Sequence, residues 1–244
     1  MRLFQVPIAH RGLHDGQSPE NSPSAFQKAI DAGYNIETDV HLLKDGKVVC
    51  FHDFTLQRVL QGKQGKIEDL TYADLCGNDY LLPNGEHIPL FEDLIALVDG
   101  KVNILCELKS INAIKFDLEK KVYELIKDKP WIKVQAFNPI SMIWFARNAP
   151  EVCRGQLATD APNKLLKILF MFTGPFKLLK KSRPDFFAYN IECLPNPKVT
   201  EACKKYGMKL LSWTVDTEEK VATAHKANVD NIIFEAIRPE GYKK

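Results

Sequence analysis

The segment "YNIETDVHLLKDGKVVCFHDFTLQR", residues 34–58, is the most informative part of the sequence. It begins with an apolar run in which two acids, Glu37 and Asp39, lie two residues apart. An Asp-Gly pair, which favours a hairpin turn, separates this run from a second one that ends at His52 and Asp53. A buried strand rarely carries two acids on one side, because burying an unpaired charge is costly. These acids therefore need an explanation from the rest of the chain.

Short apolar runs alternate with stretches of helical periodicity along most of the 244 residues, which predicts repeated βα units and a parallel sheet in one domain, residues 1–244. The expected strands cover residues 6–10, 35–40, 103–108, 133–137, 152–157, 186–190, 209–214 and 231–234. The expected helices begin with one capped by Ser22 and ended by Gly33, and continue over residues 91–98, 116–127, 140–148, 197–206 and 217–227. Eight alternating strands favour a closed (β/α)8 TIM barrel over an open sheet.

The stretch from about residue 54 to residue 90 interrupts this alternation. It is rich in glycine and proline and has few periodic apolar residues. We therefore expect a small insertion after the second strand unit, without a hydrophobic core of its own. One role for such an insertion is a cap over the site.

The composition is that of an ordinary globular protein, with 45% apolar and 26% charged residues. A formal net charge of +2 does not indicate a nucleic-acid partner. The six cysteines are scattered without a CxxC pair, which favours free thiols in a reducing compartment. The first residues lack the pattern of a signal peptide, and no run approaches the roughly 20 apolar residues of a membrane span. A cytoplasmic location is expected.

Charged residues gather at the carboxyl ends of the predicted strands, where (β/α)8 barrels build their active sites. Side chains two residues apart point to the same face of a strand, so Glu37 and Asp39 share a face, and Glu107 and Lys109 repeat this on the next parallel strand. Three converging carboxylates repel one another unless a cation lies among them. Oxygen ligands suit Mg²⁺ or Ca²⁺, and no histidine or cysteine cluster favours zinc. One divalent cation is therefore expected.

Two histidines and two basic residues belong to the same set. His10 and Arg11 end the first strand, and His52 ends the hairpin strand. Histidines on either side of an ion can move protons near neutral pH, while Arg11 and Lys109 can bind a phosphate. Taken singly, each has a structural explanation, such as an ion pair between Lys109 and Glu37. Their occurrence at one end of successive strands favours a site.

The chain resembles the glycerophosphodiester phosphodiesterase family. The segments that carry the resemblance run in family order over nearly the whole chain: "AHRG" (9–12), "PENSPSAFQKAIDAG" (19–33), "IETDVHLLKDGKVVCFHD" (36–53), "IPLFEDLI" (88–95), "CELK" (106–109), "LLSWTV" (210–215) and "NVDNIIFE" (228–235). His-Arg, Pro-Glu-Asn, Glu-x-Asp and His-Asp elements together are specific, although Glu-x-Asp or His-Asp alone is weak evidence.

The resemblance implies a metal-dependent phosphodiesterase on a (β/α)8 barrel with a small insertion. The implied roles are metal ligation for Glu37, Asp39 and Glu107, acid–base chemistry for His10 and His52, and phosphate binding for Arg11 and Lys109. Glu20 and Asn21 either support this site or pack their loop. Trp213 and Phe137 either form an apolar wall for the glycerol or belong to the core.

The family chemistry implied is attack at phosphorus by the neighbouring glycerol hydroxyl, with the metal bridging phosphate and hydroxyl oxygens. Water then opens the cyclic phosphate to give glycerol 3-phosphate and a free alcohol. Which histidine is acid and which is base stays open. Two positions depart from the family: Glu235 stands where an aspartate usually ends the closing strand, and "VQAF" (134–137) lacks the usual serine. Neither position is expected to touch the metal or proton-transfer residues, so both bear on substrate preference.

The segment "KLLKILFMFTGPFKLLKKSRP", residues 164–184, has more apolar residues than one helix face needs. A covered barrel helix or a subunit contact in a homo-oligomer is the simpler interpretation. The alternative is peripheral membrane contact through Leu165, Phe170, Met171 and Phe176, with lysines meeting anionic headgroups. The main functional hypothesis is hydrolysis of a small-molecule glycerophosphodiester. The alternatives are lysophospholipase D-type hydrolysis of lysophospholipids at a membrane surface, and a non-catalytic barrel that binds phosphodiesters.

Overall fold

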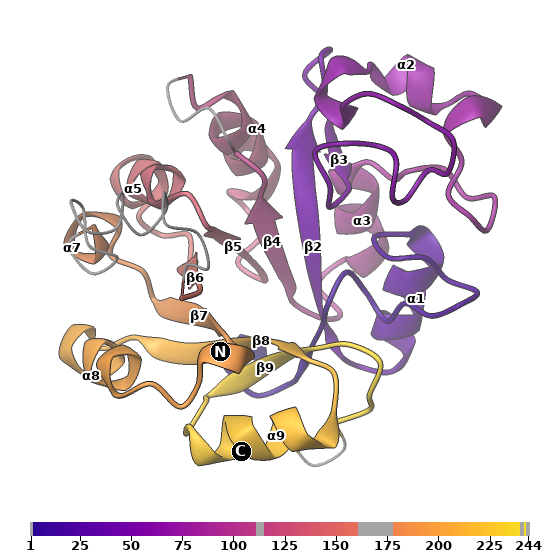
Figure 1. The fold of residues 1–244 in the computed structure, drawn as a ribbon. Helices are drawn as coiled ribbons and strands as arrows, with labels where there is room; N and C mark the ends of the chain where they lie inside the picture. Colours follow the sequence, from indigo (N-terminus) through magenta and orange to yellow (C-terminus); the bar gives the residue numbers. More distant parts are fainter. Residues whose placement is uncertain (1, 111–114, 161–177, 240–241, 243–244) are drawn as a thin grey trace.

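Eight parallel strands close into a barrel in the computed structural model, which describes residues 2–110, 115–160, 178–239 and 242 (Figure 1). The barrel strands in spatial order are β1 Ile8–Ala9, β2 Asn35–Leu42, β4 Ile104–Leu108, β5 Ile132–Ala136, β6 Arg154–Ala158, β7 Phe186–Asn190, β8 Lys209–Val215 and β9 Asn231–Phe234. Strand β1 pairs with both β2 and β9, and these pairings close the barrel. The predicted (β/α)8 TIM barrel is confirmed.

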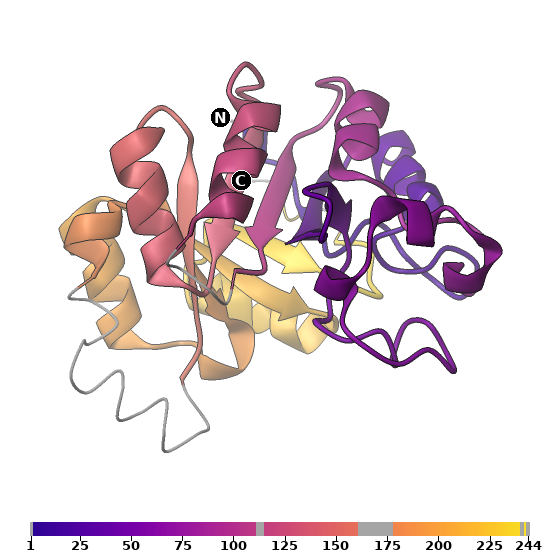
Figure 2. The same ribbon diagram turned by 90° about the horizontal axis from the view of Figure 1, so that it is seen from above.

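Helices surround the strands on the outside of the barrel (Figure 2). They are α1 Pro23–Asp31, α3 Phe91–Val98, α4 Asp117–Ile126, α5 Pro139–Asn148, α7 Leu179–Ser182, α8 Pro197–Tyr206 and α9 Glu218–Lys226. Ser22 caps α1 by accepting a hydrogen bond from the Ala25 amide, and Gly33 follows the helix with a φ of 73°. The membrane-contact residues proposed from the sequence, Leu165, Phe170, Met171 and Phe176, lie outside the described residues.

The strand predicted over residues 6–10 is only two residues long, Ile8–Ala9. Proline has no amide hydrogen, so Pro7 cannot donate to a neighbouring strand, although its carbonyl accepts from Asn35. At the other end Arg11 takes a φ of 54°, which turns the chain away from the sheet. The short strand thus places His10 and Arg11 directly at the barrel mouth.

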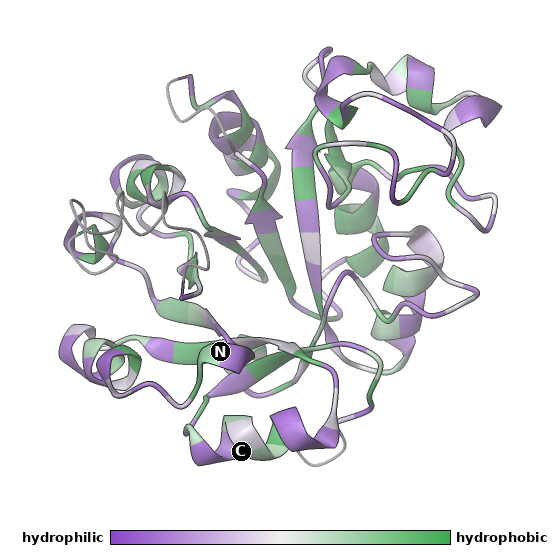
Figure 3. Ribbon diagram, in the orientation of Figure 1, coloured by the Kyte–Doolittle hydropathy of each residue, from purple (hydrophilic) through white to green (hydrophobic). Residues whose placement is uncertain are grey.

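Apolar side chains fill the lower barrel, while polar ones follow them on the same inward face. A buried cluster inside the barrel, called the inner cluster, consists of Leu3, Ile8, Leu105, Leu157, Phe186, Ala188, Leu211 and Ile233. Glu107 lies two residues beyond Leu105 along β4. In the same way Ile233 precedes Glu235 at the end of β9. Hydrophobic and hydrophilic residues alternate along β2 in Figure 3. Side chains two residues apart on a strand share a face, so both kinds of residue point into the barrel. The apolar ones fill its interior, and the polar ones that follow line its mouth.

Strand β3, Val48–Cys50, pairs antiparallel with β2 and leads into the insertion, which contains α2 Tyr72–Leu75 and the short 3-10 helices Ile67–Asp69 and Asn78–Tyr80. The expectation that this stretch has no core of its own is wrong. A separate buried cluster consists of Leu43, Val49, Phe51, Leu56, Val59, Leu60, Ile67, Leu75, Leu82, Ile88 and Leu90. These side chains come one or two at a time from β3, from short helices and from the segments between them, so no periodic pattern reveals the core.

The described part of the chain has no helix that is both long and apolar enough to cross a membrane.

Candidate active site

Three carboxylates meet at the carboxyl ends of neighbouring strands. Glu37 and Asp39 lie on β2, and Asp39 stands opposite Glu107 of β4 in the parallel register. All three side chains are buried, and one oxygen from each lies within 4.8 Å of the others. A compact set of oxygen donors without sulfur or imidazole has the chemistry that Mg²⁺ and Ca²⁺ prefer. The residues present therefore fit a hard divalent cation.

The pKa shifts of the three carboxyl groups agree with a site for a divalent cation. Burial and the charges of Asp39 and Glu107 raise the pKa of Glu37 well above its ordinary value. Burial likewise raises the pKa of Glu107 to about 7. Burial would raise the pKa of Asp39 too, but the positive charges led by Lys109 hold it well below its usual range. The pocket thus carries more carboxylate than its own cations neutralise.

Two cations lie against these acids. The Lys109 Nζ atom is 2.6 Å from Glu107 Oε1 and 2.9 Å from Asp39 Oδ1. Burial would lower the pKa of Lys109, but the two carboxylates outweigh it and raise the pKa. The Arg11 amide donates to Glu37 Oε2 at 3.1 Å, and Arg11 Nε lies 3.4 Å from Asp39 Oδ2. Lys109 and Arg11 thus place two positive side chains against the carboxylate cluster.

The loop after β1 contacts the site through two residues predicted from the sequence. The Asn21 amide donates to Asp39 Oδ2 at 3.1 Å, while its carbonyl oxygen accepts from Thr38 Oγ1 at 2.7 Å. Glu20 accepts a hydrogen bond from Arg11 Nη1 at 3.0 Å. Glu20 and Asn21 were predicted either to support the site or to pack their loop. Both side chains contact residues of the site, as the first prediction requires.

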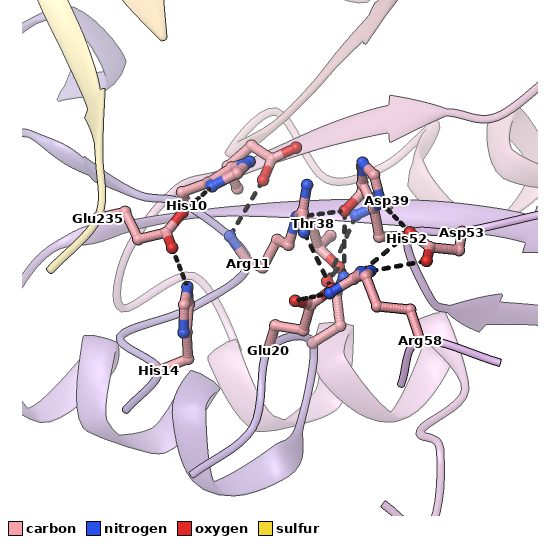
Figure 4. Close-up of polar contacts among 12 residues, drawn as sticks. His10, Arg11, His14, Glu20, Thr38, Asp39, His52, Asp53, Arg58 and Glu235 are labelled. Carbon is pink, nitrogen blue, oxygen red and sulfur yellow. Dashed lines mark hydrogen bonds and ion pairs between the residues drawn. The ribbon is translucent and has the colours of Figure 1, made fainter. Parts of the chain in front are cut away.

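Both histidines contact a carboxylate through Nδ1, which leaves Nε2 available to a ligand (Figure 4). The His10 Nδ1 atom lies 2.8 Å from Glu235 Oε2, and His52 Nδ1 is bonded to Asp53. Burial lowers the pKa of both imidazoles, although Glu235 acts to raise that of His10. The two rings are therefore neutral at pH 7, with Nδ1–H donating to its carboxylate.

Glu235 corrects an expectation from the sequence, because it does contact a predicted proton-transfer residue. The closing strand β9 lies beside β1, and the His10 amide donates to the Phe234 carbonyl at 2.9 Å. The next side chain along β9 therefore reaches the imidazole. Its other oxygen lies 3.6 Å from His14 Nε2. A closed barrel requires its first and last strands to pair, and this requirement could have predicted the contact between His10 and Glu235 from the sequence.

A cavity of about 80 Å³ opens at this end of the barrel. Its lining residues are His10, Arg11, Glu37, His52, Glu107, Lys109, Gln135, Phe137, Leu157, Trp213, Thr214 and Ile233. Phe137 and Trp213 pack edge to face with ring centroids 5.5 Å apart, and Phe137 is 46% exposed. Within the described residues no part of the insertion, 54–90, lines the cavity. The insertion lies beside the mouth instead of capping it.

A closed (β/α)8 barrel whose mouth joins a carboxylate cluster, paired cations and two oriented histidines defines a barrel enzyme that acts on an anionic substrate. The particular family follows from the sequence itself. The model of the glycerophosphoryl diester phosphodiesterase family matches residues 10–238, and the chain belongs to this family. The resemblance inferred from the motifs is confirmed.

Relatives and solved structures agree with this assignment. A glycerophosphodiester phosphodiesterase of Caldanaerobacter subterraneus is 32% identical over 93% of this chain and 92% of its own. A lysophospholipase D of Mus musculus is 34% identical over 88% of this chain and 70% of its own. The crystal structure of a glycerophosphodiester phosphodiesterase from Parabacteroides distasonis has a TM-score of 0.77 and 26% identity, covering 94% of this chain and 92% of that one.

Proposed function

We propose that the protein hydrolyses glycerophosphodiesters to glycerol 3-phosphate and an alcohol with the help of one divalent cation, Mg²⁺ or Ca²⁺. The observation that carries the proposal is the convergence of Glu37, Asp39 and Glu107 beside a cavity lined by His10 and His52. Family membership gives the reaction class its independent support. All the positions that a degenerate binding barrel would be expected to lose are filled, which disfavours the non-catalytic alternative.

Binding of the substrate follows from the two sides of the cavity. Glu37, Asp39 and Glu107 would hold the cation, which when bound supplies Lewis-acid stabilisation of charge on the phosphate oxygens. Arg11 and Lys109 face the cavity and add charge-assisted hydrogen bonds to the same phosphate. Phe137 and Trp213 form the apolar wall against which the carbon atoms of the glycerol pack.

The proton transfers belong to the two histidines. One neutral ring takes the proton of the attacking glycerol hydroxyl at Nε2, and the other, which has first taken up a proton at Nε2 from solvent, donates that proton to the oxygen of the departing alcohol as the phosphorus–oxygen bond breaks. The cyclic phosphate is then opened by water to glycerol 3-phosphate with the two roles exchanged. Glu235 and Asp53 keep Nδ1–H of His10 and His52 fixed throughout, so that the reactive nitrogen is always Nε2.

The test is release of glycerol 3-phosphate from glycerophosphocholine with Mg²⁺, with Ca²⁺ and with EDTA. We expect metal-dependent release that EDTA abolishes, and a fall in kcat of at least about 100-fold in Glu37→Gln and in His52→Ala. Glu92→Gln serves as the control, since this exposed acid on α3 forms an ion pair with Lys47 and, within the described residues, with none of the residues of the site. No release with either metal from folded protein, or full activity in Glu37→Gln, would refute the proposal.

Lysophospholipid hydrolysis is a second candidate supported by two observations. A relative from Mus musculus carries the name lysophospholipase D. In addition, Phe137 and Ile140 are the large hydrophobic side chains exposed in the described residues, 46% and 45%, and Phe137 lines the cavity. An acyl chain leaving the cavity would pass this apolar edge. Choline release from lysophosphatidylcholine that exceeds release from glycerophosphocholine, and that falls in Phe137→Ser, would favour this substrate.

We also place the protein in the cytoplasm. All six cysteines are free, and none of them has a partner sulfur. Free thiols in this number are typical of a reducing compartment. Fractionation of cells, followed by immunoblotting for the protein, tests the location.

A further inference from the structure

Arg58, at the beginning of the insertion, joins two carboxylates that come from different loops (Figure 4). Its Nε and Nη2 atoms donate to the two oxygens of Asp53 at 2.7 and 2.9 Å. Its Nη1 and Nη2 atoms donate to the two oxygens of Glu20 at 2.7 and 2.6 Å. One guanidinium thus makes two bidentate ion pairs, using four of its five N–H donors.

Each of these carboxylates also holds a residue of the cavity. Asp53 accepts the hydrogen bond from His52 Nδ1, and Glu20 accepts one from Arg11 Nη1. Arg58, Asp53 and Glu20 do not themselves line the cavity, whereas His52 and Arg11 do. Arg58 is therefore connected to the proposed proton-transfer residue His52 through Asp53. It is connected to the proposed phosphate-binding residue Arg11 through Glu20.

Removing the guanidinium would leave two negative charges facing each other across the space it fills. Like charges disfavour that arrangement, so Asp53 and Glu20 would separate and rotate toward solvent. The hydrogen bond from Arg58 is the leading cause that lowers the pKa of Asp53 to about 2, which keeps this carboxylate charged and able to accept from His52. An ammonium group cannot replace these contacts, because a point charge does not offer two parallel pairs of donors.

We propose that Arg58 is a positioning residue of the reaction: by holding Asp53 and Glu20 together, it fixes His52 as the Nδ1–H tautomer and fixes Arg11 toward the phosphate. This inference rests on the proposed function. The side chain of Arg58 is 49% exposed, so its ion pairs add little to global stability. Its effect is on geometry, and geometry of this kind governs the rate of the chemical step.

The experiment measures the histidine tautomer directly and does not depend on turnover. ¹⁵N NMR of the imidazole nitrogens would be recorded at pH 8 on the wild type and on Arg58→Ala, Arg58→Lys and Lys63→Ala. Lys63 is the matched control, since it pairs with Asp79 within the same insertion and does not line the cavity. His52 should be the Nδ1–H tautomer in the wild type and in Lys63→Ala, and a mixture of tautomers in Arg58→Ala.

Kinetics and melting complete the test. We expect kcat/KM to fall by about 10- to 100-fold in Arg58→Ala, less in Arg58→Lys, and not in Lys63→Ala. The melting temperature should move by no more than about 3 °C in all three. A pure Nδ1–H tautomer in Arg58→Ala, or kcat/KM within twofold of wild type, would overturn the inference. If the wild type itself shows no turnover, the proposed function fails, and the tautomer spectra still decide the role of Arg58. Should Arg58→Ala not fold, the spectrum of Arg58→Lys decides it.

Discussion

His10 and His52 share one arrangement, in which Nδ1 donates to a carboxylate and Nε2 is left for the substrate. The two carboxylates come from very different places in the chain. Asp53 is the next residue after His52, whereas Glu235 is 225 positions away from His10. In both cases the acid removes the choice of tautomer, so a neutral ring at pH 7 is a ready base or, after proton uptake, a ready acid.

Glu235→Ala should lower kcat by about 10- to 100-fold with a smaller change in KM, because His10 loses the partner that fixes its tautomer. Glu235→Gln keeps an acceptor oxygen without the charge and should fall between Glu235→Ala and the wild type. Steady-state kinetics on glycerophosphocholine measure both variants, with Glu92→Gln as the control. Wild-type kcat in Glu235→Ala would show that the 2.8 Å contact has no part in the reaction.

The same pair predicts how stability depends on pH. Burial lowers the pKa of His10 below 6.5, and the hydrogen bond from His10 together with the nearby His14 imidazole holds the pKa of Glu235 well below its ordinary value of 4.5. Both groups bind protons less readily in the folded state than in the unfolded state, so their contribution to stability falls as the pH falls, whereas Glu37 and Glu107, whose pKa values are raised, contribute with the opposite sign. The loss should begin as the pH drops through 6.5 and continue below 4.5.

Urea unfolding between pH 4 and pH 8 measures this decline. Glu235→Gln should lack the part below pH 4.5 that comes from Glu235, because the amide does not titrate. Because Glu37 and Glu107 act in the opposite direction, the test is the difference between the wild type and Glu235→Gln, and a difference that does not shrink as the pH falls below 4.5 would contradict the sign of the Glu235 shift.

The metal-ligand candidates illustrate what a sequence predicts at the residue scale. Glu37 and Asp39 lie two residues apart in one strand, and the strand period alone places them on one face. Their placement beside Glu107 additionally needs the parallel register, which the βα alternation supplies. Arg58 and Glu235 could not be placed in this way, because their bonds join segments whose distance in space depends on the closed barrel.

At the scale of elements, the backbone of β6 lies very close to a side chain of β7 at Gly155. A Cβ atom on Gly155 of β6 would lie 1.9 Å from Phe186 Cε2, and Phe186 of β7 is fully buried in the inner cluster. The ring has no free space to enter, so only glycine fits at this position.

Gly155→Ala should therefore lower the free energy of unfolding by about 1–3 kcal/mol or more. Urea denaturation compares it with Gly16→Ala, where an added Cβ meets no atom within 4 Å and φ lies outside the left-handed region. Equal stability of Gly155→Ala and the wild type would mean that β6 and β7 can separate at no cost.

The regular elements were predicted closely from sequence, and the insertion was not. Strands β7 and β9 and helices α3 and α8 have the predicted bounds, since each carries an uninterrupted periodic pattern between turn residues. Residues 54–90 lack that pattern, yet Leu56 and Ile67 are buried in a cluster with Val49 of β3. The cluster depends on turns that bring isolated apolar residues together, and no local period encodes such contacts.

At the scale of the whole molecule, cation binding should stabilise the fold, because a cation that binds only the folded state shifts the unfolding equilibrium. At a metal concentration about 100 times Kd the gain is about 2.7 kcal/mol, or roughly 5–10 °C in Tm for a chain of this size. Melting curves of EDTA-treated protein with added Mg²⁺ or Ca²⁺ measure the shift.

Glu107→Gln should lose this shift, and Glu92→Gln should keep it. An equal rise in Tm for Glu107→Gln and the wild type would place the bound cation away from the carboxylate cluster.

The closure of the barrel by the two residues of β1 has a consequence for biosynthesis. A ribosome delivers the chain from the N-terminus at about 5–20 residues per second, so His10 emerges roughly 10–45 s before Glu235. Until then β1 and β8 are open edges that can pair with other chains, because β9 is the strand that lies between them. A chain whose synthesis stops before residue 231 lacks both β9 and the His10–Glu235 bond, so its barrel cannot close and its His10 has no carboxylate beside Nδ1. The complete mouth of the barrel is therefore expected only in chains that include the last strand.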